Sequence, residues 1–220
     1  LSIDGSLINA KNSYCPKCKE SLKWKDLIPI LSYLFLKRKC RYCGKKISMF
    51  YPAVEFFTGI LFAICYYSFG FSYDLIISLL LVSYFAIVIV SDLNYYIIPD
   101  QVTIVIGILI FIVNILKYGF IGSLGYLLSG IIMFLFMYLV GILGSFIFKQ
   151  EALGGGDIKL LFVLGLTLPL ALSFLGIVLA TLLAFPISLY FTIKNKDKII
   201  PFGPFLIAAF LILYLSKIDV

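Results

Sequence analysis

The sequence predicts an all-α, multi-pass membrane protein with a small polar domain at its N-terminus. Of the 220 residues, 62% are hydrophobic and only 13% are charged, and the mean hydropathy is +1.10. One soluble core cannot bury that much apolar surface. The apolar residues form long runs after residue 52, whereas the first 52 residues hold four of the five cysteines and eleven basic residues. We therefore expect a cysteine-containing domain at 1–52 and a transmembrane domain at 53–220.

Apolar runs of near-spanning length predict about seven transmembrane helices in this chain. A hydrocarbon core about 30 Å thick requires roughly 20 apolar residues in a helix. The run at 158–169 is short, so it needs tilt, thinning or protein neighbours to cross. The apolar stretch at 27–36 is too short to span. An odd number of helices after a polar start suits a protein with an eighth helix upstream of Leu1. The seven runs are 53–69, 75–91, 101–116, 121–147, 158–169, 173–193 and 203–216.

The distribution of lysine and arginine predicts the orientation of these helices. Cytoplasmic loops carry an excess of basic residues, and the basic N-terminal segment is therefore expected in the cytoplasm. Only Lys117 and Lys217 then fall on the far side of the membrane. Membrane orientation accounts for the net charge of +7, and no nucleic-acid partner is needed to explain it. The loops expected on the cytoplasmic side are 92–100, 148–157 and 194–202.

Four cysteines form two C-x-x-C pairs, Cys15 with Cys18 and Cys40 with Cys43. Each pair can place two thiolates on one metal ion, and four thiolates make a closed tetrahedral zinc site. A closed set of ligands predicts a structural zinc, because a catalytic zinc keeps one position open. The alternatives are two disulfides or unligated core thiols, and a reducing cytoplasm disfavours the disulfides. Cys65, alone in an apolar run, is expected to be a small core residue.

The chain contains no histidine, which limits the possible catalytic chemistry. Ser-His and Cys-His nucleophilic pairs are excluded, as are histidine-ligated metalloprotease motifs. Carboxylates remain, and Asp92 and Asp157 lie at membrane-boundary depth on the same expected side. Ionisable groups at that depth are costly and indicate function. Two carboxylates brought together can share a proton and act as base and acid on a water molecule, as in aspartic proteases.

Simpler interpretations of the same acids stay open at this point. Asp157 could be a helix N-cap after a flexible glycine turn, and Asp100 after Pro99 looks even more like a cap. Asp92 could be a loop residue at the water interface. A transporter or channel would also place acids at membrane depth, although no inverted repeat of broken helices is evident. A zinc-ribbon membrane adaptor without catalysis would need the cysteines but neither aspartate.

Several further motifs follow one another along the chain. They are LIPILSYLFL at 27–36, KCRYCGKKIS at 39–48, YPAVE at 51–55, SDLNYYIIPD at 91–100, GGGDIK at 154–159 and PFGPFL at 201–206. Together they resemble the signature of the type IV prepilin peptidases, members of the GxGD family of membrane aspartyl proteases. The resemblance covers nearly the whole chain, and several ordered motifs are far more specific than a single GxGD.

The resemblance implies that Asp92 and Asp157 are the two catalytic aspartates and leaves Asp100 as a cap. The glycines Gly154, Gly155 and Gly156 would let the backbone approach an extended substrate and let Asp157 move toward its partner. Lys159 is expected to tune the local charge or to anchor near the headgroups. Snorkelling toward the interface is the alternative for this lysine.

The resemblance also implies the substrates and the location. The expected substrates are type IV prepilin or pseudopilin precursors with a short basic leader and an apolar helix, cut on the cytoplasmic side of the bacterial inner membrane. Such family members often also methylate the new N-terminus from S-adenosylmethionine. Glu55 is the candidate for that second site, and a partner for the helix N-terminus is its alternative role. No glycine-rich nucleotide-binding motif supports methylation independently, so a peptidase without methyltransferase activity stays an alternative.

Overall fold

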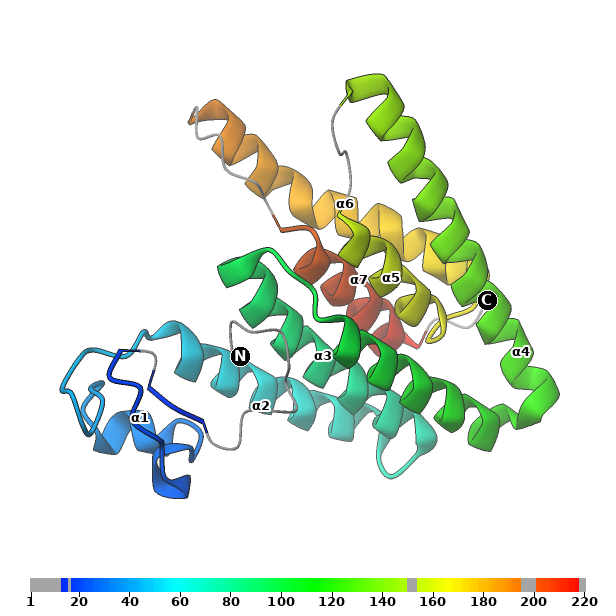
Figure 1. Ribbon diagram of the computed structural model, residues 1–220. Helices are drawn as coiled ribbons and strands as arrows, with labels where there is room; N and C mark the ends of the chain where they lie inside the picture. Colours follow the sequence, from blue (N-terminus) through cyan, green and yellow to red (C-terminus); the bar gives the residue numbers. More distant parts are fainter. Residues whose placement is uncertain (1–12, 16, 150–153, 195–200, 218–220) are drawn as a thin grey trace. The chain divides into compact units, whose positions relative to one another are not determined.

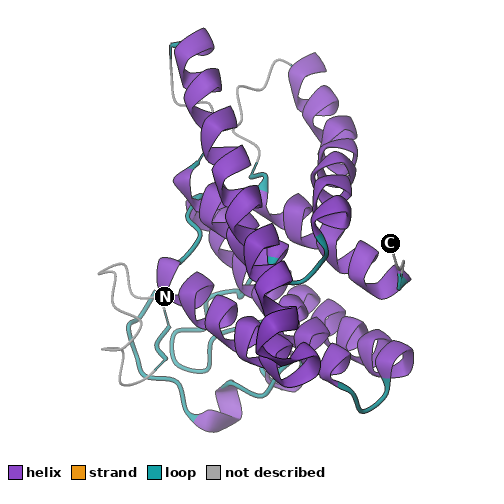
Figure 2. Ribbon diagram, turned by 90° about the vertical axis from the view of Figure 1, so that its right-hand side faces the viewer, coloured by secondary structure: helices purple, strands orange, loops and turns teal. Residues whose placement is uncertain are grey.

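The structure is a computed structural model that describes residues 13–15, 17–149, 154–194 and 201–217. In these ranges the secondary structure is helical apart from two isolated bridges, Tyr14 with Ser21 and Lys39 with Lys46 (Figure 2). The predicted all-α fold class is confirmed. The chain divides into two compact units, residues 1–60 and 61–220, and each is described by itself.

The first unit contains the cysteine motifs and little regular structure. Its elements are the 3-10 turn η1 (Trp24–Asp26), the short helix α1 (Leu31–Phe35) and the start of α2 (Phe50–Phe69). The apolar stretch 27–36 thus forms a helix of only five residues, in line with the expectation that it does not span. The Glu55 Oε2 atom accepts a hydrogen bond from the Ile30 N–H at 2.8 Å, which ties this stretch to α2. The unit ends inside α2, so the division at residue 52 into two functional domains stays a prediction.

The second unit is a bundle of apolar helices in which α4 consists of two arms (Figure 1). The arms meet at Gly119, whose φ of 73° and ψ of 172° interrupt the helix and suit glycine. They correspond to the two runs predicted at 101–116 and 121–147. Besides the end of α2, the bundle contains α3 (Tyr73–Tyr95), α4 (Asp100–Phe148), α5 (Gly155–Gly165), α6 (Leu170–Ile193) and α7 (Gly203–Ser216).

Among the described residues, four helices are long and apolar enough to cross a membrane: α2, α3, α4 and α6. The protein is therefore a multi-pass membrane protein, while the predicted number of about seven spans is not established. The shortest apolar helix of the bundle, α5, has 11 residues. At 1.5 Å per residue it is about 17 Å long, roughly half of a hydrocarbon core.

Protein neighbours surround this short helix, as its length required. Leu160, Leu161 and Leu164 are fully buried. At the crossing of α5 with the second arm of α4, a Cβ added to Gly165 would lie 2.7 Å from the Gly130 Cα. Small residues allow such close backbone approach between membrane helices. Packing against α4 therefore supports α5 where lipid could not.

Polar side chains also satisfy the C-terminal end of α5, where backbone carbonyls lack partners within the helix. Asn114 Nδ2 donates to the Leu166 carbonyl at 2.7 Å. Ser129 Oγ donates to the Leu168 carbonyl at 3.2 Å and lies 3.3 Å from Ser173 Oγ. An unpaired carbonyl in an apolar environment costs several kcal/mol, on the order of 2–7. These contacts hold the C-terminal end of α5 in place.

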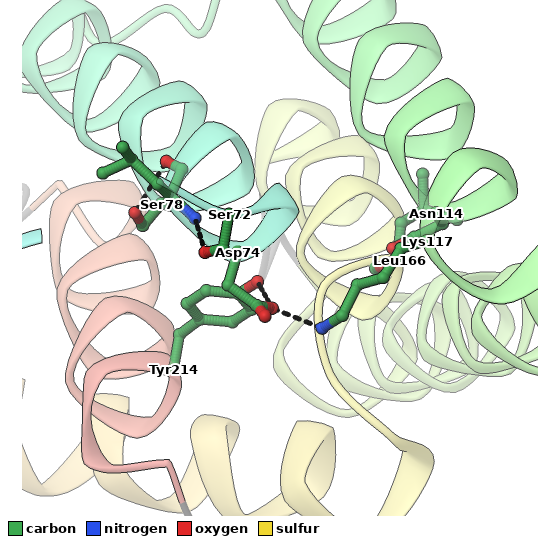
Figure 3. A network of polar contacts seen from close by, with 8 residues as sticks. Ser72, Asp74, Ser78, Asn114, Lys117, Leu166 and Tyr214 are labelled. Atoms are coloured by element: carbon green, nitrogen blue, oxygen red, sulfur yellow. Dashed lines mark hydrogen bonds and ion pairs between the residues drawn. The ribbon is translucent and has the colours of Figure 1, made fainter. Parts of the chain in front are cut away.

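The helix α3 connects the two ends of the bundle. Asp74 lies in its first turn and Asp92 near its last turn, which places their Cα atoms about 27 Å apart along the axis. At the Asp74 end, Asp74 Oδ1 accepts hydrogen bonds from Lys117 Nζ and from the Tyr214 hydroxyl, the latter at 2.8 Å (Figure 3). This cluster joins α3, the first arm of α4 and α7. The candidate catalytic residues lie at the other end.

Candidate active site

The Asp92 carboxylate is buried near the end of α3 and faces the start of α7. Asp92 is only 7% exposed. A Cβ added to Gly203, the first residue of α7, would lie 3.0 Å from Asp92 Oδ2, so the backbone of this residue lies close to the carboxylate. The first N–H groups of a helix lack intrahelical acceptors and carry partial positive charge. The start of α7 thus offers a partly positive environment to Asp92, whereas the burial of this residue disfavours its charged form.

Asp157 is the third residue of α5. The N-cap is Gly154, and the Asp157 N–H donates to the Gly154 carbonyl at 3.1 Å. The alternative in which Asp157 itself is the N-cap is therefore wrong. Its carboxylate turns back toward the helix start, where a Cβ on Gly154 would lie 3.6 Å from Oδ2. A side chain at Gly154 would contact the carboxylate, which glycine leaves accessible.

The buried side chain of Ile98 joins the segments that carry the two acids. A Cβ on Gly156 would lie 3.1 Å from the Ile98 Cβ, and a Cβ on Gly203 would lie 3.1 Å from its Cδ1. The loop after α3, the start of α5 and the start of α7 therefore meet at one end of the bundle. Asp92 and Asp157 therefore lie at the same end of the bundle, on segments that meet at Ile98. The structure thus brings together the two acids that the sequence analysis selected.

The predicted capping role of Asp100 is wrong. Pro99 is the N-cap of α4 and makes no side-chain cap, and Asp100 is the first helical residue. From that position the Asp100 carboxylate extends outward, and Oδ2 accepts a hydrogen bond from Lys159 Nζ at 2.7 Å. Both side chains are about half exposed, at 57% and 51%. Lys159 therefore links the first turns of α4 and α5 by a surface ion pair.

The four N-terminal cysteines form one cluster in the first unit. Their sulfur atoms all lie within 4.8 Å of one another, and no disulfide joins them. A zinc ion with Zn–S bonds of about 2.3 Å requires sulfur atoms about 3.8 Å apart, so a small adjustment would complete a tetrahedral site. The cluster can hold a metal ion, and the disulfide alternative finds no support here. Its members are Cys15, Cys18, Cys40 and Cys43.

The two cysteine pairs sit in the same kind of turn. The Lys19 N–H donates to the Cys15 carbonyl at 2.8 Å, and the Gly44 N–H donates to the Cys40 carbonyl at 3.0 Å. Lys19 and Gly44 both follow the second cysteine of their pair and both have left-handed φ, at 57° and 67°. Such repeated turns direct two thiols of each pair toward one point.

The local backbone also prepares Cys15 for metal binding. Hydrogen bonds from the backbone N–H groups of Cys18 and Lys17 lower the pKa of Cys15 to about 6. The thiolate is the form that ligates metal ions. Cys65, by contrast, is fully buried in α2, and its predicted role as a small core residue is confirmed.

Glu55 lies on α2 in the first unit, where it binds the Ile30 N–H as described above. Its predicted role in methyl transfer stays a prediction.

The sequence analysis did not predict two contacts at the aspartate end. They are the close approach of Gly203 to Asp92 and the packing of Ile98 against Gly156 and Gly203. Ile98 and Gly203 both belong to motifs noted in the sequence analysis. The neighbouring residues in the sequence do not indicate which parts of the chain these two residues contact.

Two known family models match this chain, and together they include residues of both units. The bacterial peptidase A24 N-terminal domain matches residues 2–69, and the type IV leader peptidase family matches residues 79–189. No solved structure gives a significant match to this chain.

Curated relatives support the same grouping. The prepilin leader peptidase/N-methyltransferase of Myxococcus xanthus is 37% identical over 165 residues, 75% of this chain. This chain spans about half the length of that relative, with 49% covered. The Bacillus subtilis protein of the same name is 33% identical over 217 residues, covering 94% of this chain and 83% of the relative. The Vibrio cholerae protein of that name is 29% identical and covers 95% and 83%. With this family match over half of its length and a relative 33% identical over 217 residues, this chain belongs to the type IV leader peptidase family.

Proposed function

We propose that this protein is a membrane aspartyl endopeptidase that removes the short basic leader of type IV prepilin or pseudopilin precursors. The observation that carries the proposal is the meeting of Asp92 and Asp157 at one end of the bundle, around Ile98 and Gly203. Membership in the leader peptidase family supports it, as do relatives named prepilin leader peptidase/N-methyltransferase.

The mechanism uses the two carboxylates and one water molecule. A water between Asp92 and Asp157 attacks the scissile carbonyl carbon as the ionised aspartate accepts its proton. The protonated aspartate donates its proton to the carbonyl oxygen, and a proton returns to the leaving amine as the C–N bond breaks. Close carboxylates do not readily ionise together, so they share one proton. Asp157 lies in the first turn of α5 and Asp92 faces the first residue of α7, so the partial positive charge of two helix starts favours the negative charge that passes between the acids.

Cleavage of a prepilin by the purified protein tests this proposal. In liposomes, the protein should convert a full-length precursor into a leader peptide and a mature chain with a new N-terminus. A non-catalytic zinc-ribbon adaptor would bind the precursor without cleaving it, and a transporter would neither bind nor cleave the precursor. Intact precursor after prolonged incubation with folded protein, over a panel of pilin-like substrates, would contradict the peptidase assignment.

We further propose that the four-cysteine cluster holds one structural zinc ion. Four thiolates leave no open position for catalysis, so the metal would stabilise the first unit, and its loss would affect proteolysis indirectly. Metal analysis should find one zinc per chain and none after replacement of Cys15, Cys18, Cys40 and Cys43 by serine. Zinc that survives the replacement of all four would contradict this site.

A second proposed activity is methylation of the new N-terminus from S-adenosylmethionine, with Glu55 involved. It rests on relatives named prepilin leader peptidase/N-methyltransferase and on the motif that carries Glu55. Mass spectrometry of the mature product, made with the methyl donor present, should find one added methyl group, and Glu55→Gln should remove it. An unmethylated product from the unaltered protein would mean that the protein is a peptidase without methyltransferase activity.

The proposed location is the bacterial inner membrane, with the aspartate end facing the cytoplasm. The skew of lysine and arginine supports this orientation. Cysteines introduced at Tyr96 and Phe71, both exposed, report on the two ends of α3 when the zinc-site cysteines are kept. A membrane-impermeant thiol reagent applied from the cytoplasmic side should label position 96 and spare position 71, and the reverse pattern would overturn the orientation.

A further inference from the structure

A chain of two hydrogen bonds joins α3 to the first turn of α4. The Tyr84 hydroxyl lies 2.7 Å from Thr103 Oγ1, and Thr103 Oγ1 donates to the Pro99 carbonyl at 3.1 Å. A threonine hydroxyl has a single proton to donate. Because Thr103 donates that proton to Pro99, the Tyr84 hydroxyl is the donor in the first bond. Tyr84 and Thr103 are both buried, so bulk water does not compete for these groups.

The segment between α3 and α4 is held at both of its ends. It consists of residues 96–99, and Tyr96 has a left-handed backbone with a φ of 54°. The Tyr96 N–H donates to the Asp92 carbonyl at 3.0 Å, which attaches the segment to α3. At the other end, the Pro99 carbonyl accepts from the N–H and from the hydroxyl of Thr103, each at 3.1 Å. The hydrogen bond from α3 to the Thr103 hydroxyl therefore supports the second attachment.

This segment carries the side chain on which the starts of α5 and α7 pack. Ile98 precedes Pro99, and it lies against Gly156 of α5 and Gly203 of α7. Gly156 directly precedes Asp157 in the first turn of α5. A shift of the segment would therefore move the carboxylate that α5 carries.

Tyr84 also lies on the same face of α3 as the first aspartate. Tyr84, Val88 and Asp92 are spaced by four residues, so their side chains follow one another along the helix. A Cβ added to Gly203 would lie 3.0 Å from Asp92 Oδ2 and 3.3 Å from Val88 Cγ1. This face of α3 therefore contacts α7 beside Asp92, and it contacts α4 two turns earlier, about 12 Å along the axis.

We propose that Tyr84 is a positioning residue for the two aspartates. Through Thr103, its hydroxyl fixes the segment 96–99 and so holds Asp157 on α5 in place relative to Asp92 on α3. The inference rests on the proposed peptidase function and adds to it a residue that acts only through its neighbours. A hydroxyl pair that served stability alone would leave the turnover of folded protein unchanged. A positioning role predicts instead that kcat falls while the KM for the precursor is kept.

Two buried tyrosines at opposite ends of the bundle allow a matched test, because tyrosine-to-phenylalanine substitution removes only the hydroxyl. Tyr84→Phe should lower kcat for prepilin cleavage about fivefold, the factor expected for one net hydrogen bond, and leave KM within about twofold. Tyr214 donates to Asp74 at the far end, and Tyr214→Phe should leave both constants within about twofold. Thr103→Val repeats the test should Tyr84→Phe fold poorly, and Thr103→Ser, which keeps the hydroxyl, should retain the rate.

Hydrogen exchange of the backbone amides at 96–103, followed by mass spectrometry, is a readout that needs no substrate. Tyr84→Phe should speed exchange there by about threefold or more, whereas Tyr214→Phe should not. Unaltered kcat in Tyr84→Phe, or unaltered exchange at 96–103, would overturn the inference, as would an equal fall in kcat for Tyr214→Phe. If the unaltered protein cleaved no precursor, the proposed function would fail, and the exchange comparison would still decide whether Tyr84 holds the segment.

Discussion

The two ends of α3 each carry an aspartate, and their surroundings differ. Asp74 is joined to the Lys117 ammonium and the Tyr214 hydroxyl, so its charge is neutralised within a cluster that links three helices. Asp92 has no ion-pair partner among the residues that the structure describes, and another acid, Asp157, lies on a segment that packs on the same residue, Ile98. An acid with a cation at membrane depth stabilises the fold, whereas an acid beside an acid retains a proton that chemistry can use.

The residues that surround each acid differ as well. Long side chains from α4 and α7 fill the Asp74 end, as Figure 3 shows. At the Asp92 end, the glycines Gly203 and Gly156 bring backbone close to the acids and to Ile98. Glycine leaves room for a peptide chain to approach a carboxylate. The same helix therefore ends in a cluster of long polar side chains on one side and beside closely packed glycine backbone on the other.

The largest expected effect is at the catalytic end. Asp92→Asn or Asp157→Asn should lower prepilin cleavage by more than about 10³-fold, because an amide cannot exchange the proton. Asp100→Asn should cost little, since its carboxylate makes a half-exposed ion pair. Initial rates in protein shown to be folded measure the difference. Near-normal cleavage by either of the first two variants would remove that residue from the mechanism.

At the other end of α3, substitution should affect stability and spare the chemistry. Asp74→Asn keeps an acceptor for Tyr214 but leaves the Lys117 ammonium without its counter-charge, at a cost of about 2 kcal/mol in the free energy of unfolding. The rate per folded molecule should stay within about twofold of the unaltered protein.

Thermal unfolding in detergent measures this loss, and a second substitution provides the control. Adding Lys117→Met to Asp74→Asn should recover part of the stability, because the unpaired charge is removed. If Asp74→Asn lowered the cleavage rate without lowering the thermal stability, Asp74 would have a role in catalysis, and the proposed difference between the two ends of α3 would be wrong.

The smallest predicted effect distinguishes two adjacent glycines. A Cβ on Gly156 would lie 3.1 Å from the Ile98 Cβ, whereas a Cβ on Gly155 meets nothing within 4 Å. Gly156→Ala should therefore shift the first turn of α5 and lower cleavage about fivefold, an effect of roughly 1 kcal/mol. Gly155→Ala should be neutral or slightly stabilising, because alanine favours helix. Equal rates for the two variants would mean that the contact with Ile98 does not position Asp157.

Local features of the sequence determined much of this protein. Apolar runs predicted the all-α membrane fold, and C-x-x-C spacing predicted a cluster of four cysteines whose sulfur atoms the structure brings within 4.8 Å. The motifs selected Asp92 and Asp157 without any knowledge of the fold. These features are visible because hydrophobic runs and ligand spacing depend on residues close together in the chain.

Tertiary structure alone decided which residues complete the site. Asp100 looked like a helix cap, yet it pairs with Lys159, 59 residues away. Asn114 satisfies the end of α5 from 52 residues away, and Tyr214 reaches Asp74 across 140. Packing of membrane helices depends on close backbone approach at small residues and on buried polar contacts, and neither leaves a periodic pattern in an apolar run. The partners of each acid therefore became known only when the helices were packed together.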